Sequence, residues 1–388
     1  MLRRIQCLVL LVFLPHMARA QAAKGYTQSN LISNGSVNAQ QTDTQLVNPW
    51  GVAIGHQTPF WINAAGSGLS EVYDAGANKQ FSVKIPSAGG PNKNGSPTGI
   101  VFNSSTTDFA LPSGGASLFI FDALDGTISA WNTNVTDAKL VVDNSATGAA
   151  YTGLAIINNG TANYLLAADL TGNKIDVFDS KFAPATLSGN FTDPSIPAGF
   201  APFNVHVIKN QVFVMYGQQN ANGVSAFPPM AGTGYVSVFD NTGKFVARAI
   251  SGGHLDAPWG LALAPASFGE FGGDLLVGNF GDGTISAYDP TSFVLKGQLN
   301  DLQGHQFKTR VSGRSLLAPM EPAIRIRSIS QLDSARKEAA CSGRSRQQHL
   351  RAREISQSTW PKLQSPSSRA DPQQCRSTFF LQTDLPCR

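Results

Sequence analysis

The stretch DGTISAW at Asp125–Trp131 decides the fold, because it returns almost unchanged as DGTISAY at Asp282–Tyr288. A second motif, NPWGVA at Asn48–Ala53, returns as APWGLA at Ala257–Ala262. Each copy reads as an apolar strand opened by glycine, a second strand, a tight turn, a third strand with an aromatic end, and a fourth strand. Repeated four-strand units are typical of propeller blades, so the sequence predicts an all-β protein of the β-propeller type.

The residues that open the inner strands set the phase of the repeat, and they are Gly51, Gly99, Gly153, Asn204 and Gly260. Their intervals of 48, 54, 51 and 56 residues are close to the period of known propeller repeats. Five blades are therefore recognisable, and a sixth should open at about residue 312. The chain does not contain that blade in its own reading frame. We therefore expect a six-bladed type with an incomplete last blade.

Local chemistry supports these units within residues 21–307. Gly126, Gly172 and Gly283 lie in the turns between second and third strands, where a positive φ favours glycine. Residues 21–307 contain no cysteine, so packing alone must stabilise the blades. We expect recurring aromatic side chains to fill the wedges between sheets, namely Phe119, Phe121, Trp131, Phe178, Phe239, Phe280 and Tyr288.

The composition changes from about Phe307 onward. Residues 308–388 contain fifteen Lys and Arg against six Asp and Glu, whereas residues 21–307 contain eleven against nineteen. A basic tail taken alone would indicate an arm that binds nucleic acid or a membrane. The alternative is a change of reading frame near Gln306. On this second interpretation residues 308–388 are a disordered, non-native tail, and no nucleic-acid partner is expected.

The alternative reading frame can be examined from the codons that each residue permits. For Val311–Glu338, codons can be chosen that encode these residues in the given frame. The same nucleotides, read from two positions later, then encode LWALSFGTDGTGNPNTLYFTAGLGKE. Its LWAL resembles the inner strand Pro258–Leu263, and its TLYFTAG resembles the second strand Asp274–Asn279. The segment falls where the phase requires the sixth blade. We therefore predict a frame change between the codons for Gly304 and Val311.

The amino end has the pattern of a secretory signal peptide over residues 1–20. Arg3 and Arg4 precede an apolar run, Cys7–Leu14, and Ala18–Ala20 forms an A-x-A cleavage site. This pattern predicts export, to the periplasm or the extracellular space. The apolar run is too short to span a bilayer, so we expect no membrane span. We further expect a monomer.

Four motifs resemble an uncharacterised family of exported bacterial six-bladed β-propellers related to NHL-repeat proteins: NPWG at Asn48–Gly51, APFN at Ala201–Asn204, PWG at Pro258–Gly260 and NFGDG at Asn279–Gly283. The resemblance covers about residues 28 to 306 and departs from the family where the last blade is incomplete. It implies a fold and export, and it brings no established activity. It also implies that an N-terminal strand, Asn30–Ser33, completes the last blade.

Short polar residues end the predicted second strands and suggest a binding site. They are Asn63, Asp122, Asp169 and Asn279, and one inner strand adds Asn204 and His206. We expect these side chains to converge on a central funnel, where oxygen ligands would suit Ca²⁺ or Mg²⁺. The alternative is that they bond to backbone groups in turns, and that His206 is an ordinary inner-strand residue. The long segment Gly217–Gly234 is either a lid over this face or an inert insertion.

Catalytic signatures are absent from the sequence of residues 21–307, which has no nucleophile elbow, phosphate loop or zinc motif. We therefore assign no catalytic residue and favour a protein that is not an enzyme. The leading hypothesis is an exported binding or interaction protein for a glycan, peptide or cell-envelope partner. A metal-dependent lactonase-like hydrolase is the alternative, by analogy of fold. A decayed, non-functional gene product is the third.

Overall fold

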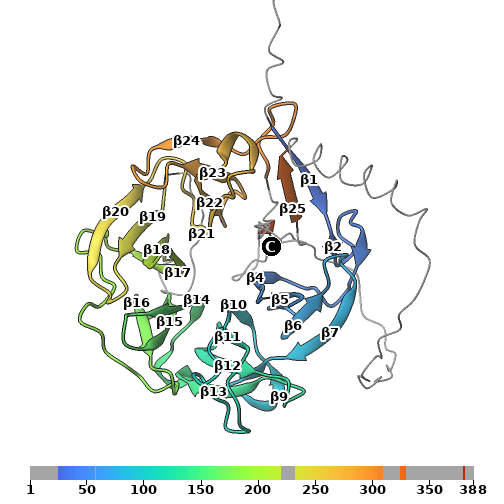
Figure 1. Ribbon diagram of the computed structural model, residues 1–388, viewed down its shortest axis with the longest axis vertical. Coiled ribbons are helices and arrows are strands. Elements are labelled where there is room, and N and C mark those ends of the chain that lie inside the picture. Colours follow the sequence, from blue (N-terminus) through green and yellow to red (C-terminus); the bar gives the residue numbers. More distant parts are fainter. Residues whose placement is uncertain (1–24, 57, 220–231, 309–323, 329–378, 381–388) are drawn as a thin grey trace, which may run out of the picture.

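The computed structural model describes residues 25–56, 58–219 and 232–308, and the backbone of two strands at 324–328 and 379–380. Five antiparallel sheets stand around a common centre (Figure 1). Each sheet is built from strands that are consecutive in the sequence. This arrangement confirms the predicted β-propeller with five blades.

The blades follow one another along the chain. The first contains β4 (Pro49–Ala53), β5 (Phe60–Ala64), β6 (Leu69–Tyr73) and β7 (Lys79–Lys84), and the second contains β10 (Pro97–Phe102), β11 (Phe119–Ala123), β12 (Thr127–Trp131) and β13 (Lys139–Asp143). The third contains β14 (Tyr151–Asn158), β15 (Asn163–Asp169) and β16 (Lys174–Phe178). The fourth contains β17 (Phe200–Ile208), β18 (Gln211–Gln218), β19 (Tyr235–Phe239) and β20 (Phe245–Ser251). The fifth contains β21 (Pro258–Leu263), β22 (Leu275–Asn279), β23 (Ile285–Tyr288) and β24 (Leu295–Gln298).

Every inner strand carries a register shift at, or one residue before, the residue that sets the phase of the repeat. Such bulges bend a strand and increase its twist. They also bring neighbouring inner strands so close that a Cβ on the bulge glycine would meet the next blade. The close pairs are Gly51 with the Thr98 carbonyl oxygen (2.5 Å), Gly99 with the Leu154 nitrogen (2.6 Å), and Gly153 with the side chain of Asn204.

The aromatic side chains fill the spaces between blades largely as expected. Phe119, for example, is buried and stacks on Trp61 of the first blade, with ring centroids 4.2 Å apart. Phe280 differs from the prediction, because it packs against Trp50 at the centre of the ring, with centroids 5.4 Å apart. A wedge position was expected for Phe280 because the aromatic residues recur at matching places in the repeat, but its ring packs in the cluster that also contains Phe203 and Trp259.

Two of the three predicted turn glycines adopt a positive φ, namely Gly126 at 76° and Gly283 at 72°. In the third blade, Asn173 takes the left-handed conformation at φ 51°, in place of Gly172. Asparagine tolerates this region better than other residues with a Cβ, so the turn can place its positive φ one residue later.

The N-terminal segment links the fifth blade to the first. Its strand β1 (Tyr26–Asn30) pairs with β25 (Ile324–Ser328), which pairs with β26 (Phe379–Phe380). The next strand, β2 (Ile32–Ser33), pairs with β3 (Gln41–Thr42). The predicted closing strand, Asn30–Ser33, was therefore placed too late in the sequence.

Side-chain anchoring explains this position of β1. The Tyr26 hydroxyl donates to the carbonyl oxygen of Phe268 (3.1 Å) and accepts from the amide of Phe271 (3.0 Å), both in the fifth blade. Ile32 packs against Leu46 and Ile62 of the first blade region.

Most of residues 308–388 and all of residues 1–20 lie outside the described residues, so the disordered tail and the signal peptide stay predictions.

Two glycines test the contact between inner strands. We expect Gly153→Ala to lower the free energy of unfolding by about 1–3 kcal/mol, because its Cβ would meet Asn204 of the next blade. Gly260→Ala should change it by less than about 0.5 kcal/mol, because the nearest atom of the described residues would be 3.8 Å from its Cβ. Urea unfolding followed by circular dichroism measures both values. Equal losses in the two variants would contradict this account of blade spacing.

Candidate functional site

Asn63 and Asp122 lie opposite the bulges of β4 and β10 and hold the inner strand of the second blade. The Asn63 amide donates to the carbonyl oxygens of Thr98 (3.2 Å) and Gly99 (2.9 Å). Asp122 accepts from the Gly99 amide (2.5 Å) and the Thr98 hydroxyl (2.7 Å). The two side chains therefore satisfy backbone groups that the bulge removes from the regular ladder.

The carboxyl group of Asp122 is fully buried. Burial raises its pKa to about 6, although the hydrogen bonds from Thr98 and from the amides of Gly99 and Gly153 act in the opposite direction. Desolvation is the larger effect because the charged form loses its hydration inside the propeller.

Asp169 and Asn279 occupy a different position in their strands from Asn63 and Asp122. Each pairs with the first residue of its inner strand, whereas Asn63 and Asp122 face the bulge. Successive side chains of a strand point to opposite faces, so an offset of one residue changes the direction of the side chain. The assumption that all four share one repeat position was therefore wrong.

The contacts of Asp169 and Asn279 agree with this offset. Asp169 accepts from the amide of Ala150 (3.1 Å), in the loop that enters β14. Asn279 accepts from the amide of Asp256 (3.1 Å) and donates to the carbonyl oxygen of His254 (2.7 Å), in the loop that enters β21. Both side chains thus fix the loop that leads into their own blade.

Asn204 and His206 lie on β17 and contact each other, with the Asn204 amide nitrogen 3.3 Å from the His206 Nε2. The Asn204 amide also donates to the carbonyl oxygen of Trp259 in the fifth blade (2.7 Å). The half-buried His206 ring has its pKa lowered to about 4 by burial, so it is neutral at pH 7.

The six predicted residues contact the inner strands and the loops that enter them. In the described part of the chain, Asn204 and His206 are the pair that lies within hydrogen-bonding distance. No group of three or more His, Cys, Asp or Glu side chains in the described ranges could hold a metal ion. The Asn and Asp side chains already bond to groups of the protein, with Asn63 and Asp122 both held by Thr98 and Gly99, so they do not fit a shared Ca²⁺ or Mg²⁺ ion. Their role in ligand binding stays a prediction.

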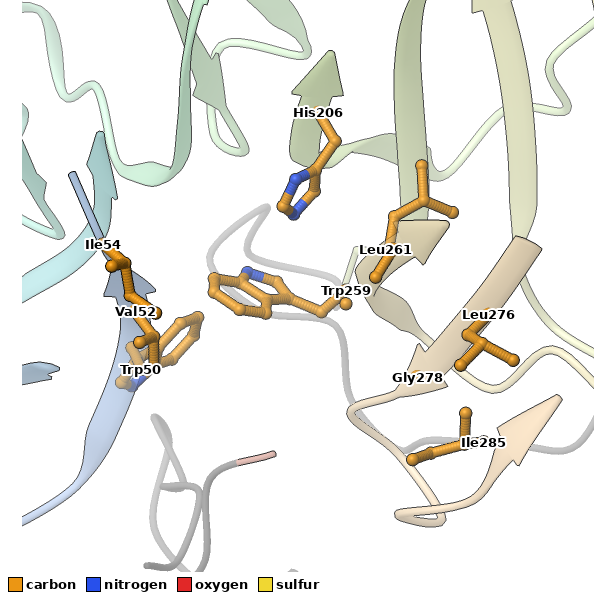
Figure 2. Close-up of a pocket in the computed structure, with 11 residues that line it drawn as sticks. Trp50, Val52, Ile54, His206, Trp259, Leu261, Leu276, Gly278 and Ile285 are labelled. Atoms are coloured by element: carbon orange, nitrogen blue, oxygen red, sulfur yellow. The ribbon is translucent and has the colours of Figure 1, made fainter. Parts of the chain in front are cut away.

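A cavity of about 290 Å³ lies between β4 of the first blade and the inner strands of the fifth. Figure 2 shows Trp259 and His206 between two apolar walls. Val52 and Ile54 form the wall from the first blade. The side chains of the opposite wall come from the fifth blade, and they are Leu261, Leu276 and Ile285.

Trp50 and Trp259 are fixed at the centre of the ring beside this cavity. Their ring centroids are 5.7 Å apart, with an interplanar angle of 83°. The Trp259 indole N–H donates to the carbonyl oxygen of Thr152 (2.8 Å), and the Trp50 indole N–H donates to the Asn48 side chain (2.9 Å). Since both N–H groups have protein partners, the indoles offer apolar ring surface to the cavity.

Sequence reasoning quoted Trp50 and Trp259 as part of a repeated motif and did not identify them as cavity residues. A signal was present, because Pro-Trp-Gly occurs in the first and the fifth blade and in none of the three between them. These two blades lie near each other because the blades are arranged in a circle. Most of the predicted lid, residues 220–231, lies outside the described residues.

The fold and the cavity define this chain as a protein of the β-propeller class. It is 34% identical over 283 residues to the uncharacterised protein R648 of Acanthamoeba polyphaga mimivirus, covering 70% of this chain and 68% of that protein. It is 33% identical over 271 residues to the uncharacterised protein L690 of the same virus, covering 67% of this chain and 70% of that protein. The chain belongs to the family of these two proteins. No family model matches the chain.

The bacterial source and the export implied by the earlier resemblance stay predictions, since these relatives are viral.

Among solved structures, the soluble aldose sugar dehydrogenase of Escherichia coli is 12% identical with a TM-score of 0.45, covering 74% of this chain and 93% of that chain. A nidogen/laminin complex is 12% identical with a TM-score of 0.44, covering 73% and 85%. Similarity at this level has no bearing on ligand or activity. Among the described residues, no helix is long and apolar enough to cross a membrane.

Asp122 and His206 should oppose each other in the pH dependence of stability. Asp122 has a pKa of about 6 in the folded protein, above its ordinary pKa of 3.8. Between pH 3.8 and 6 the folded state binds the proton more tightly than the unfolded state, so the contribution of Asp122 to stability falls as the pH rises. His206 has a pKa of about 4 in the folded protein, below its ordinary pKa of 6.5. Between pH 4 and 6.5 the unfolded state binds the proton more tightly, so the contribution of His206 to stability rises as the pH rises.

Single substitutions should separate the two effects. Relative to the unmodified protein, Asp122→Asn should gain stability as the pH rises from 4 to 6, by up to about 3 kcal/mol. His206→Gln should lose relative stability over the same range. Urea unfolding at half-unit steps of pH measures both differences. Differences that stay constant with pH in both variants would show that neither group titrates as described.

Proposed function

We propose that this chain is an exported binding protein that holds an apolar group of its partner in the cavity between the first and fifth blades. The observation that carries this proposal is the lining of that cavity. Its walls are aliphatic, its indole N–H groups are already bonded, and His206 is the polar side chain among the lining residues. Ligand sites of this kind are mostly apolar with a few polar groups that orient the ligand.

The same lining narrows the class of partner. Glycans need several hydrogen-bond donors and acceptors, because their hydroxyl groups lose water on binding. His206, neutral at pH 7, is one such group, and the walls from Val52 to Ile285 provide none. A peptide or an apolar cell-envelope component therefore suits the cavity better than a glycan.

The hydrolase alternative lacks a supporting observation of this kind. A metal-dependent lactonase needs side chains that share one cation. Asn63 and Asp122 instead bond to Thr98 and Gly99 of β10, and Asn279 bonds to the loop that enters β21. The hypothesis of a decayed gene product depends on the coding DNA. Sequencing of codons 300–345 should show that the frame two nucleotides later is open and encodes the Leu-Trp-Ala-Leu pattern. A stop codon in that frame would refute the frame change.

Binding to the cavity can be tested with the apolar fluorophore 8-anilinonaphthalene-1-sulfonate. We expect one molecule to bind per folded chain and to reduce tryptophan emission by energy transfer from Trp50 and Trp259. Ile54 is 44% exposed at the cavity, so Ile54→Asp should leave the fold intact. The added charge should weaken binding by about tenfold or more, because the fluorophore would desolvate it.

Val246→Asp is the matched control, since Val246 is 54% exposed on β20 and does not line the cavity. It should bind the fluorophore as the unmodified protein does. Urea unfolding of each variant establishes that the folded state is being compared. If Ile54→Asp and Val246→Asp bind the fluorophore equally well, the cavity is not the binding site.

A further inference from the structure

Four polar side chains meet where the N-terminal segment packs on the first blade, away from the apolar cavity. Lys79 opens β7, and its Nζ is 2.8 Å from Asp43 Oδ2 and 2.8 Å from Glu71 Oε2. The Tyr73 hydroxyl donates to the same Asp43 oxygen (2.8 Å). An amine, a carboxyl group that can acylate it and a second carboxyl group are therefore in contact.

Strand pairing fixes three of these side chains on one face of the first blade. Glu71 and Tyr73 are two residues apart on β6, so their side chains point to the same face. Tyr73 pairs with Lys79, and Glu71 pairs with Ser82 on β7. Paired residues of an antiparallel sheet share a face. The amine of Lys79 and the carboxyl group of Glu71 are thus brought together by the register of two strands.

Asp43 reaches this face from the N-terminal segment. Its backbone amide donates to the carbonyl oxygen of Ser33, at the end of β2 (2.8 Å). Its Oδ1 accepts from the amide of Gln45 (2.9 Å), and the Gln45 Oε1 accepts from Lys79 Nζ (2.9 Å). Asp43 and Lys79 are therefore held in contact from both sides. Two groups held in this way react far more readily than the same groups free in solution.

Glu71 distinguishes this cluster from an ordinary surface ion pair. Its side chain is 0% exposed, and among the described residues its Oε1 has no hydrogen-bond partner. Burial raises the pKa of Glu71, although the hydrogen bonds from Lys79 and Ser82 act in the opposite direction. A carboxyl group with a raised pKa can accept a proton from an amine and pass it on, as a general base and then a general acid.

Tyr73 acts on the other reacting group. Burial raises the pKa of Tyr73, and the neighbouring Asp43 carboxyl group acts in the same direction. The hydroxyl group therefore keeps its proton and donates it in a hydrogen bond to Asp43 Oδ2. A donor on this oxygen stabilises the negative charge that develops there when a nucleophile attacks Cγ.

We propose that Lys79 and Asp43 condense to form an intramolecular amide bond. Lys79 Nζ attacks Asp43 Cγ, so that one C–N bond forms and one C–O bond of the carboxyl group breaks. The ammonium nitrogen loses two protons, and both leave with the oxygen as one molecule of water. Glu71 carries one of these protons from Nζ to the departing oxygen. Nothing is oxidised or reduced, and one positive and one negative charge disappear.

The ion pair is the starting state of this reaction. Burial lowers the pKa of Lys79, but its contacts with Asp43 and Glu71 raise the pKa by more. Nζ therefore keeps its third proton until a neighbouring carboxyl group accepts it. We expect the amide bond to form after folding, because the folded chain holds the three groups together.

The amide bond ties the N-terminal segment to the first blade. Residues 21–307 contain no cysteine, so a disulfide bond cannot make this connection. A covalent link between residues 43 and 79 closes a loop in the unfolded chain and reduces its conformational freedom. It therefore stabilises the position of β2 and β3 against the first blade.

Digestion with trypsin after unfolding in urea detects the link in the full chain, as purified and after a week of storage. Between Lys24 and Lys84, Lys79 is the one further site at which trypsin cuts. The linked chain should yield residues 25–84 as one peptide, uncut at Lys79 and lighter by one water molecule. Fragmentation in the mass spectrometer should locate the loss at Asp43 and Lys79. Complete cutting at Lys79, with residues 25–79 at full mass, would refute the proposal.

Two substitutions test the roles of the reacting groups. Lys79→Arg keeps the positive charge but cannot form the link, so residues 25–79 should appear at full mass. Glu71→Gln keeps a buried side chain of the same size and removes the proton carrier, so the linked fraction should fall by about tenfold or more. Circular dichroism establishes that each variant folds. A folded Glu71→Gln variant that links as fully as the unmodified protein would refute the role of Glu71.

Lys296 is a matched control within the same chain. Its Nζ is 2.7 Å from Asp274 Oδ1 and 3.4 Å from Asp289 Oδ2. The Asp289 side chain is 33% exposed, and hydrogen bonds from the amides of Ser292 and Thr291 lower its pKa, so it is a poor proton carrier. Trypsin should therefore cut at Lys296. Loss of cutting at Lys296 with the same loss of water would show that contact alone suffices, which contradicts the role given to Glu71.

Discussion

The contact between Trp50 and Trp259 joins the first blade to the fifth at the centre of the ring. The two indoles meet edge to face with centroids 5.7 Å apart, and Phe203 and Phe280 pack around them. An aromatic pair of this geometry adds about 0.5–1.5 kcal/mol to the stabilisation from burial alone. The Trp259 N–H bond to Thr152 extends the connection to the third blade. The relative position of the blades on both sides of the cavity depends on this cluster.

Buried polar side chains support the same arrangement where the inner strands bulge. A bulge interrupts the regular ladder, and a buried backbone group without a partner costs about 1–3 kcal/mol. Asn63 bonds to the carbonyl oxygen of Gly99, and Asp122 bonds to its amide. Short polar side chains therefore recur near the ends of second strands for a structural reason. Their recurrence resembles a ligand ring in the sequence, although their polar atoms bond to groups of the protein itself.

The cavity follows from the same repeat. Three bulge glycines have no room for a Cβ, because the next inner strand packs against them. Gly260 occupies the same position of the repeat, but in the described part of the chain no neighbouring inner strand packs against it. The apolar walls that face this space are those that a blade would normally cover. This explains why a site between the first and fifth blades is lined by aliphatic side chains and carries little polar chemistry.

The sequence by itself determined the strands, the phase of the repeat and most of the turns, because these depend on local alternation and on glycine at fixed intervals. Gly126 and Gly283, for example, adopt the positive φ that their Asp-Gly turns predict. The direction of the polar side chains needed the register of paired strands, and an offset of one residue separates Asp169 from Asp122. Only the tertiary structure brought Trp50 beside Trp259, since the circular arrangement of the blades places the first near the fifth. The cavity between these two blades is a product of that arrangement and has no local sequence pattern.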